Sequence, residues 1–251
     1  MWQNFWASVR KRRAWLAIAL PAWVIMSFVL TQLVIYLAII GLDAVGVKLD
    51  ALNQSVFNTV TGVIIYGVTL GVVIGVPWLV GKHRTTLKDI GLHRFPHWVE
   101  IALPLAGFIV YVALSAALLY GAQYLPFINL GQPQDTGFGE IFSRYEYILA
   151  FFTLVVLAPL AEEILFRGYL FGKLMKHVPV WVAILITSIL FGVAHGAWNV
   201  GIDVFALSVV LCLLRVISKS LWPSILLHML KNAIAFFLLF IYPLSVGIVG
   251  L

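Results

Sequence analysis

The chain has 251 residues, of which 63% are hydrophobic and only 10% are charged. A soluble domain carries about 25% charged residues, so a soluble protein of this size could not cover its surface with so few. The composition excludes an ordinary soluble domain and makes lipid the main solvent of the chain. The single cysteine, Cys212, excludes an internal disulfide.

Seven apolar segments can be drawn along the chain, joined by loops that contain glycine, proline, aspartate and asparagine. They cover residues 14–41, 56–80, 98–120, 147–173, 180–197, 201–217 and 221–242. Because a membrane-spanning helix takes about 20 apolar residues, we expect an all-α, polytopic transmembrane bundle of about seven helices. The first three helices fall within residues 1–145, and a core of four helices falls within residues 146–251.

The first segment follows residues 2–13, a stretch that mixes aromatic with basic side chains. The apolar run after this stretch is too long for the core of a signal peptide, and no small-residue cleavage site closes it. The pattern predicts a retained first helix with an aromatic and basic collar at the membrane interface.

Basic residues gather in every second loop. They are Arg10, Lys11, Arg12 and Arg13 before the first segment, Lys82, Arg84, Lys88 and Arg94 after the second, Lys173 and Lys176 after the fourth, and Arg215 and Lys219 after the sixth. The alternate loops hold Lys48 and Arg144 together with Asp43, Asp50, Asp135, Glu140 and Asp203. The positive-inside rule then predicts a multi-pass plasma-membrane protein with a cytoplasmic N-terminus and an outer C-terminus. This placement explains the net charge of +6 without a nucleic-acid partner.

Ionisable side chains inside membrane helices are costly and mark functional sites by default. Segment four contains Glu162, Glu163 and Arg167 in its inner part. Glu163 and Arg167 are four residues apart and share a helix face in the better order for an ion pair, so we assign them to a structural pair. Glu162 points about 100° away and has no local partner, which suits a general base or acid. The alternative is that both glutamates merely lie at the cytoplasmic interface.

Two further clusters lie in segments five and seven. Phe191 and His195 are four residues apart, as are His228 and Asn232, so the members of each pair share one helix face. Taken alone, each pair can be a packing or polar contact between helices. Together the three clusters supply a carboxylate, two imidazoles and an amide, which are groups that activate water and stabilise an oxyanion.

A count of helical rise tests whether the clusters meet. Glu162 lies about 8 Å and His228 about 10 Å above the inner boundary of an apolar core about 30 Å thick. His195, counted from Val180, comes out about 22 Å above the same boundary. Helix five must therefore begin inside the boundary or tilt strongly, or helix four must extend inward past Lys173.

These motifs resemble the CAAX prenyl endopeptidase and bacteriocin-processing family of intramembrane proteases, also called CPBP or Abi. The family pattern reads EExxxR, then FxxxH, then HxxxN or HxxxB, and it matches Glu162, Glu163 and Arg167, then Phe191 and His195, then His228 and Asn232. The resemblance covers roughly residues 145–242. It implies a helical bundle with a cavity open to the cytoplasm and to lipid, with Phe191 as a supporting residue. In that cavity Glu162 and His195 would activate water, and His228 and Asn232 would hold the oxyanion.

The resemblance leaves two readings of the metal requirement, because the family was long labelled as metalloproteases. This chain lacks the HExxH motif. Glu162, His195 and His228 could form a zinc set, in which Asn232 would be an atypical fourth ligand. We favour the metal-independent glutamate mechanism and expect no cofactor, with zinc as the alternative.

The sequence therefore predicts an intramembrane endopeptidase that lies in membrane lipid and cleaves peptides or proteins in or near the membrane. Eukaryotic relatives cleave prenylated CAAX tails, but the compact chain looks bacterial or archaeal, where such tails are not expected, so no substrate and no oligomeric state are assigned. The alternatives are a non-catalytic scaffold or bacteriocin-immunity protein of the same fold, and a proton-coupled transporter. A transporter is disfavoured because the chain shows no internal repeat.

Overall fold

A computed structural model describes the backbone of residues 2–131, 136–139, 141 and 143–242, and the side chains of these residues except 2–14 and 50. The described residues form helices without any β-strand. Six of the helices are long and apolar enough to cross a membrane, and a shorter apolar helix accompanies them. The predicted all-α polytopic bundle of about seven helices is therefore confirmed, and the chain is an integral, multi-pass membrane protein.

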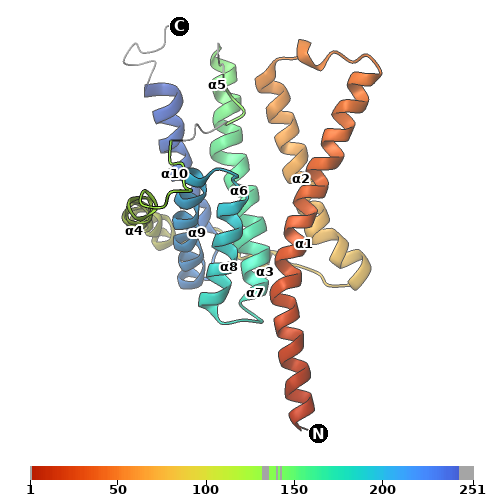
Figure 1. Ribbon diagram of the computed structural model, residues 1–251, viewed down its shortest axis with the longest axis vertical. Helices are drawn as coiled ribbons and strands as arrows, with labels where there is room; N and C mark the ends of the chain where they lie inside the picture. The colour runs from red at the N-terminus through yellow and green to blue at the C-terminus, as the bar shows by residue number, and fades with distance from the viewer. Residues whose placement is uncertain (1, 132–135, 140, 142, 243–251) are drawn as a thin grey trace.

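The first two helices form a hairpin at one side of the bundle (Figure 1). Helix α1 runs from Trp2 to Ala44, and α2 runs from Gln54 to Gly81 after the short turn η1, Leu49–Ala51. Asn53 caps α2 by accepting a hydrogen bond from the Val56 amide at 3.1 Å, which satisfies one of the free donors at a helix start. The aromatic and basic collar predicted for residues 2–13 lies on helical backbone in α1 and stays a prediction, because those side chains are outside the described set.

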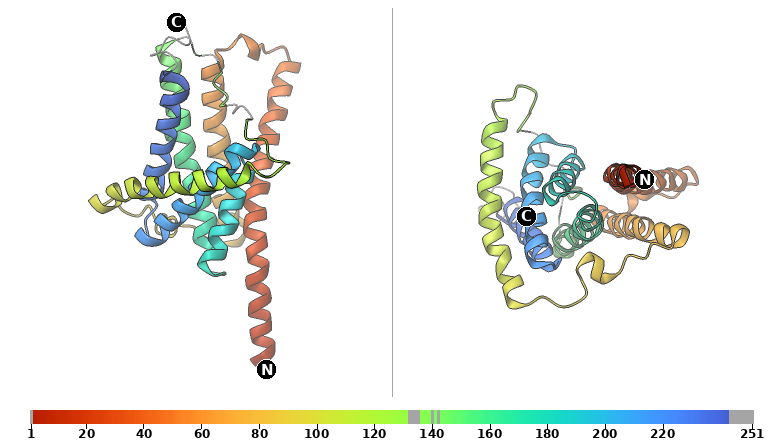
Figure 2. Two further views of the ribbon diagram at one scale, coloured as in Figure 1. Left: turned by 60° about the vertical axis from the view of Figure 1, so that its left-hand side comes forward. Right: turned by 90° about the horizontal axis from the view of Figure 1, so that it is seen from below.

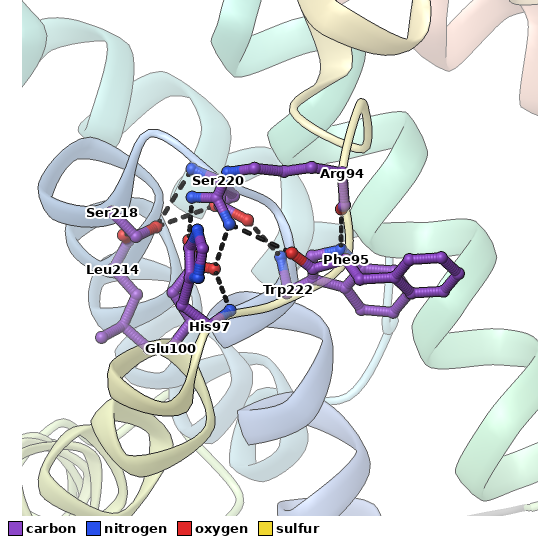
Figure 3. A network of polar contacts seen from close by, with 8 residues as sticks. All are labelled: Arg94, Phe95, His97, Glu100, Leu214, Ser218, Ser220 and Trp222. Carbon is purple, nitrogen blue, oxygen red and sulfur yellow. Dashed lines mark hydrogen bonds and ion pairs between the residues drawn. The ribbon is translucent and has the colours of Figure 1, made fainter.

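Helix α4, Trp98–Ala122, follows the short helix α3, Leu87–Ile90, and runs across the other helices (Figure 2). It packs on α9 and α10 through a shared apolar cluster that includes Tyr111, Leu207 and Leu227. A polar network at its start fastens the loop before α4 to the turn before α10 (Figure 3). Arg94 donates to both carboxylate oxygens of Glu100 at 2.7 and 2.9 Å, and Trp222 Nε1 donates to the Arg94 carbonyl at 2.7 Å.

One long helix, interrupted by two π-helical stretches, runs through the centre of the bundle. Its parts are α5 Arg144–Phe151, η2 Phe152–Leu157, α6 Ala158–Glu163, η3 Ile164–Phe171 and α7 Gly172–Leu174. Pro159 is the second residue of α6, just after η2, and a proline supplies no amide hydrogen to the helix ladder. Stretches of π-helix occur frequently at functional sites, and α6 lies between the two of them.

The chain then turns back through three helices. They are α8 Val180–Val193, α9 Trp198–Ser218 and α10 Trp222–Phe236, which continues as η4 Phe237–Ile241. The prediction of a spanning helix over residues 180–197 is wrong in length. Helix α8 has 14 residues and rises about 21 Å, less than the apolar thickness of about 30 Å. Residues 194–197 form a turn instead, with Gly196 at φ +72°, a conformation that favours glycine.

This geometry removes the predicted mismatch in depth. Helix α7 ends at Leu174 and α8 begins at Val180, so both helices are counted from the same end of the bundle (Figure 1). From there Glu162 lies about 18 Å and His195 about 22 Å along the axis. The sequence alone placed the inner boundary of the apolar core only about 8 Å below Glu162. In the structure the long helix continues about 18 Å beyond Glu162, to Leu174.

Two charges predicted to lie in loops belong to α9. Asp203 accepts hydrogen bonds from Tyr111 at 2.7 Å and from Ser115 at 2.5 Å, and its other oxygen lies 3.5 Å from Lys231 Nζ. Arg215 is buried and donates to the Asp89 carbonyl at 3.3 Å. Both residues therefore lie on a helix and not in a loop, and each contacts a neighbouring element.

Candidate active site

A buried carboxylate, Glu163, joins the long helix to α10. Its Oε1 accepts from Arg167 Nη1 at 2.7 Å and lies 2.9 Å from His228 Nδ1. Glu163 and Arg167 have no exposed side-chain area, and the Arg167 guanidinium lies 4.3 Å from the centre of the Phe191 ring. The pair expected from the four-residue spacing is thus present, and it holds one histidine as well as one arginine.

Glu162 points in a different direction from the same helix, although it also lies near His228. Tyr66 Oη donates to Glu162 Oε1 at 2.7 Å, and His228 Nε2 lies 3.8 Å from Glu162 Oε2. The side chain keeps 18% of its area exposed, whereas that of Glu163 keeps none. The sequence spacing offers Glu162 no partner on its own helix. The tertiary structure supplies Tyr66, which reaches it from α2.

Sequence reasoning missed Tyr66. Its hydroxyl donates a hydrogen bond to a carboxylate 96 positions along the chain. The only feature of the sequence that indicated a role for Tyr66 is that a phenol lies inside the apolar second segment. A tyrosine hydroxyl normally finds a hydrogen-bond partner when it is buried, so a polar group had to be expected beside it. The sequence did not indicate which group this would be.

His195 lies in the turn that follows the C-terminal end of α8. Its Nδ1 lies 2.8 Å from the Phe191 carbonyl oxygen, and a carbonyl can only accept. The contact therefore assigns the proton to Nδ1 and leaves Nε2 of the neutral ring as an acceptor. The ring packs edge to face on Phe191 at 5.0 Å between centroids, so Phe191 supports both the position and the protonation site of His195.

Glu162, Tyr66 and His195 line one cavity of about 450 Å³. Its other side is formed largely by apolar residues of α1, including Val24 and Phe28. The structure thus brings the predicted base and the predicted first histidine to the same space. The expectation that both reach one water molecule stays a prediction.

Asn232 lies one turn beyond His228 and contacts the long helix. Its Nδ2 donates to the Leu154 carbonyl at 2.8 Å. In η2 the Ala158 amide donates to the carbonyl five residues back, at Thr153. By the same pattern, the Leu154 carbonyl would accept a hydrogen bond from the amide of residue 159. That residue is Pro159, which has no amide hydrogen, and Asn232 supplies the missing donor. An amide nitrogen carries two hydrogens, so the second one can serve an oxyanion.

Phe191 is the common neighbour of the site. Its ring lies 5.0 Å from Phe166, 5.0 Å from His195 and 5.7 Å from His228, measured between centroids. The ring is fully buried. The site is therefore assembled from α2, the long helix, α8 and α10 around one aromatic side chain.

The described residues contain no group of three or more His, Cys, Asp or Glu side chains placed to hold a metal ion. The alternative zinc set of Glu162, His195 and His228 is thus not formed in this conformation. Both histidines engage their Nδ1 atoms with protein oxygens. The expectation of a cofactor-free mechanism stays a prediction.

The hydrogen bond from Tyr66 leads to a direct test. Tyr66→Phe removes the donor to Glu162 and leaves the ring in place. Hydrogen bonds to charged groups contribute about 1.5–3 kcal/mol, so we expect the cleavage rate to fall about tenfold or more. The control is Tyr36→Phe, since Tyr36 is 60% exposed on α1. Equal rates for the two variants would show that the reaction does not use this hydrogen bond.

Comparison with known proteins shows that residues 144–234 are similar to one protein family. The family model described as type II CAAX prenyl endopeptidase Rce1-like matches residues 144–234. The UPF0177 protein YxdF of Lactococcus lactis subsp. lactis (strain IL1403) is 28% identical over 124 residues, which are 49% of this chain and 64% of that protein. An uncharacterized 24.3 kDa protein of Escherichia coli is 31% identical over 161 residues, 62% of this chain and 60% of that protein.

A third relative, named "Putative membrane peptidase YdiL" in Bacillus subtilis (strain 168), is 30% identical over 77 residues, 31% of this chain and 32% of that protein. The chain spans less than two thirds of the length of each of these relatives. No solved structure matches the chain. The residues that the Rce1-like family model matches, 144–234, include all three polar motifs and the helices that carry them.

Proposed function

We propose that this protein is an intramembrane endopeptidase that hydrolyses peptide bonds of peptides or proteins in or next to the membrane. The observation that carries the proposal is the cavity of about 450 Å³ in which Glu162 and His195 meet. It lies inside a bundle of apolar helices, and its α1 side is apolar, which suits a substrate that arrives through lipid. The match of the Rce1-like family model to residues 144–234 supports the same reaction class.

In the proposed reaction Glu162 takes a proton from water while the water oxygen attacks the peptide carbonyl carbon. His195 Nε2, left as an acceptor by the Nδ1 contact to Phe191, orients the same water. The carbonyl oxygen becomes an oxyanion, the carbon–nitrogen bond breaks, and Glu162 returns the proton to the leaving amine. Water is thus the only co-reactant.

His228 and Asn232 are proposed to hold the oxyanion. His228 is flanked by Glu163 at Nδ1 and by Glu162 at Nε2. A ring protonated at both nitrogens donates at each, so it can keep Glu163 with one and stabilise the oxyanion with the other. Donors fixed in advance around a developing negative charge are a large source of catalysis.

The proposal is tested with the full chain in proteoliposomes together with bacterial membrane proteins. New peptide termini are identified by mass spectrometry. We expect termini within or beside hydrophobic segments, and we expect them to persist with 1,10-phenanthroline. Loss of cleavage with the chelator and recovery with Zn²⁺ would establish the zinc alternative. No new termini would favour a scaffold or immunity protein over an enzyme.

We further propose that the protein lies in the plasma membrane with its N-terminus in the cytoplasm. The described helices support opposite sides for the two ends, since α1 begins at one end of the bundle and η4 finishes at the other (Figure 1). A reporter fused after Leu251 should score as external. A cytoplasmic score would overturn this orientation.

A further inference from the structure

A cationic pocket lies at the end of the bundle where α1 begins, away from the candidate active site. It is a cavity of about 430 Å³ between the end of α2 and the last turns of the long helix. Four cations line it: Lys82 and Arg84 from the chain after α2, and Lys173 and Lys176 from the end of the long helix. Two regions that are far apart in sequence thus direct positive charge to one space.

The pocket contains one carboxylate, and that carboxylate is already engaged. Asp89 Oδ2 accepts from the Thr86 hydroxyl at 2.7 Å and from the Thr86 amide at 3.0 Å, while Oδ1 pairs with Lys176 at 3.2 Å. The Thr86 hydrogen bonds, ahead of Lys176, lower the pKa of Asp89 to about 2, so it stays ionised at neutral pH. Within the described residues, no carboxylate pairs with Lys82, Arg84 or Lys173, and the pocket keeps an excess of positive charge.

The position of the pocket corresponds to the level of lipid headgroups. The candidate span of α2 ends at Gly81, and that of the long helix ends at Leu174. Lys82 and Arg84 follow the first end directly, and Lys173 and Lys176 flank the second. Just before Lys82, the side chains of Leu79 and Val80 are 76% and 84% exposed, as expected of residues that face acyl chains.

A second cavity of about 530 Å³ adjoins the first. It shares Arg84 and Thr85 with the cationic pocket, and Ile74, Leu87 and Ile90 are among its other residues. One cavity offers cations and its neighbour offers apolar surface, which together match an amphiphile better than a free anion.

We propose that this pocket binds the phosphate of an anionic phospholipid, with the headgroup among Lys82, Arg84, Lys173 and Lys176 and the lipid body over the adjoining cavity. Basic pockets between membrane helices on the cytoplasmic side are suited to such headgroups. Gly168 and Gly172 of the long helix line the same pocket, so a bound headgroup would contact the helix that carries Glu162. The proposal does not depend on the protease activity.

The test uses the full chain in neutral detergent, with binding measured by native mass spectrometry and by melting temperature. Dioctanoyl phosphatidylglycerol, dioctanoyl phosphatidylcholine and inorganic phosphate are titrated separately. We expect phosphatidylglycerol to bind and to raise the melting temperature, and the other two to bind at least about tenfold more weakly. The lipid contrast follows from the attraction of anionic headgroups to basic residues, and the phosphate contrast from the added apolar contact.

Two double variants lower the net charge by the same amount, one inside the pocket and one outside it. Lys82→Gln/Lys173→Gln removes two pocket cations, whereas Lys219→Gln/Lys48→Gln removes two cations elsewhere. Lys82 and Lys219 have the same left-handed backbone, with φ of 52° and 56°, so their replacement strains the backbone equally. At roughly fivefold per cation, the pocket variant should bind phosphatidylglycerol about 25-fold more weakly, and the control variant should bind like the parent.

Four results would overturn the proposal. Equal losses in both double variants would show a general surface-charge effect. Phosphate binding as tight as phosphatidylglycerol binding would assign the pocket to a free anion. Phosphatidylcholine binding as tight as phosphatidylglycerol binding would remove the role of anionic charge. No measurable phosphatidylglycerol binding by the folded parent chain would reject a lipid site at this position.

Discussion

Replacing Glu162 by glutamine is expected to abolish most cleavage while the protein stays folded. General acid–base catalysis contributes about 10²–10⁴-fold, and a glutamine side chain could neither take the proton from water nor return it to the amine. The Glu162 side chain lies beside a cavity, is partly exposed and has Tyr66 as its main partner. A glutamine amide oxygen can still accept the hydrogen bond from Tyr66, so the melting temperature should change little.

The measurement is the rate of cleavage of a peptide identified in the proteoliposome screen, together with the melting temperature in detergent. Glu100→Gln is a suitable control, since Glu100 is also a helix carboxylate but pairs with Arg94 at a distance from the cavity. Full activity of Glu162→Gln would remove Glu162 from the mechanism. An inactive Glu162→Gln that has also lost its folded state would be interpreted through Tyr66→Phe, which keeps the carboxylate.

Replacing Glu163 by glutamine is expected to destabilise the protein and also to lower its activity. Arg167 would lose its charged partner in a fully buried place, and breaking such a pair costs about 3–5 kcal/mol. Two other nitrogens of Arg167 have no hydrogen-bond partner among the described residues, so little is left to hold the charge. His228 would lose the carboxylate at its Nδ1 as well.

The double variant Glu163→Gln/Arg167→Leu separates these two effects. Removing the stranded guanidinium should restore much of the melting temperature, whereas His228 would still lack its carboxylate, so activity should stay low. As a control, Lys176→Leu breaks the pair with Asp89, in which the two side chains are 61% and 40% exposed, and exposed pairs contribute only about 0–1 kcal/mol. An inactive Glu163→Gln that melts like the parent would show that Glu163 acts in the chemistry and not in the fold.

These predictions refine the roles that the motifs suggested. The four-residue spacing of Glu163 and Arg167 correctly indicated a contact, because positions one turn apart on a helix are neighbours whatever the tertiary structure is. It did not indicate that His228 would join them. The same carboxylate therefore serves both the architecture and the proposed oxyanion site, and the division of labour between Glu162 and Glu163 is less sharp than spacing suggests.

The sequence by itself determined the class of the fold and most helix limits. Few charges and long apolar runs admit only a membrane bundle, because lipid leaves no partner for open backbone groups. The long helix was predicted over residues 147–173 and observed over 144–174. The error at α8 has a local cause: the turn Ala194–Ala197 contains one glycine and no proline, and hydropathy cannot show where an apolar helix stops.

Only the tertiary structure decided which side chains meet. Tyr66 reaches Glu162 from α2, Asp203 is balanced by α4 and α10, and Asn232 supplies the donor that Pro159 lacks. The physical reason is the separation along the chain of the residues that make contact. Helix geometry fixes neighbours three or four residues apart from the covalent chain alone, whereas contacts between helices depend on how whole apolar faces pack, and that packing is shared among all the helices of the bundle.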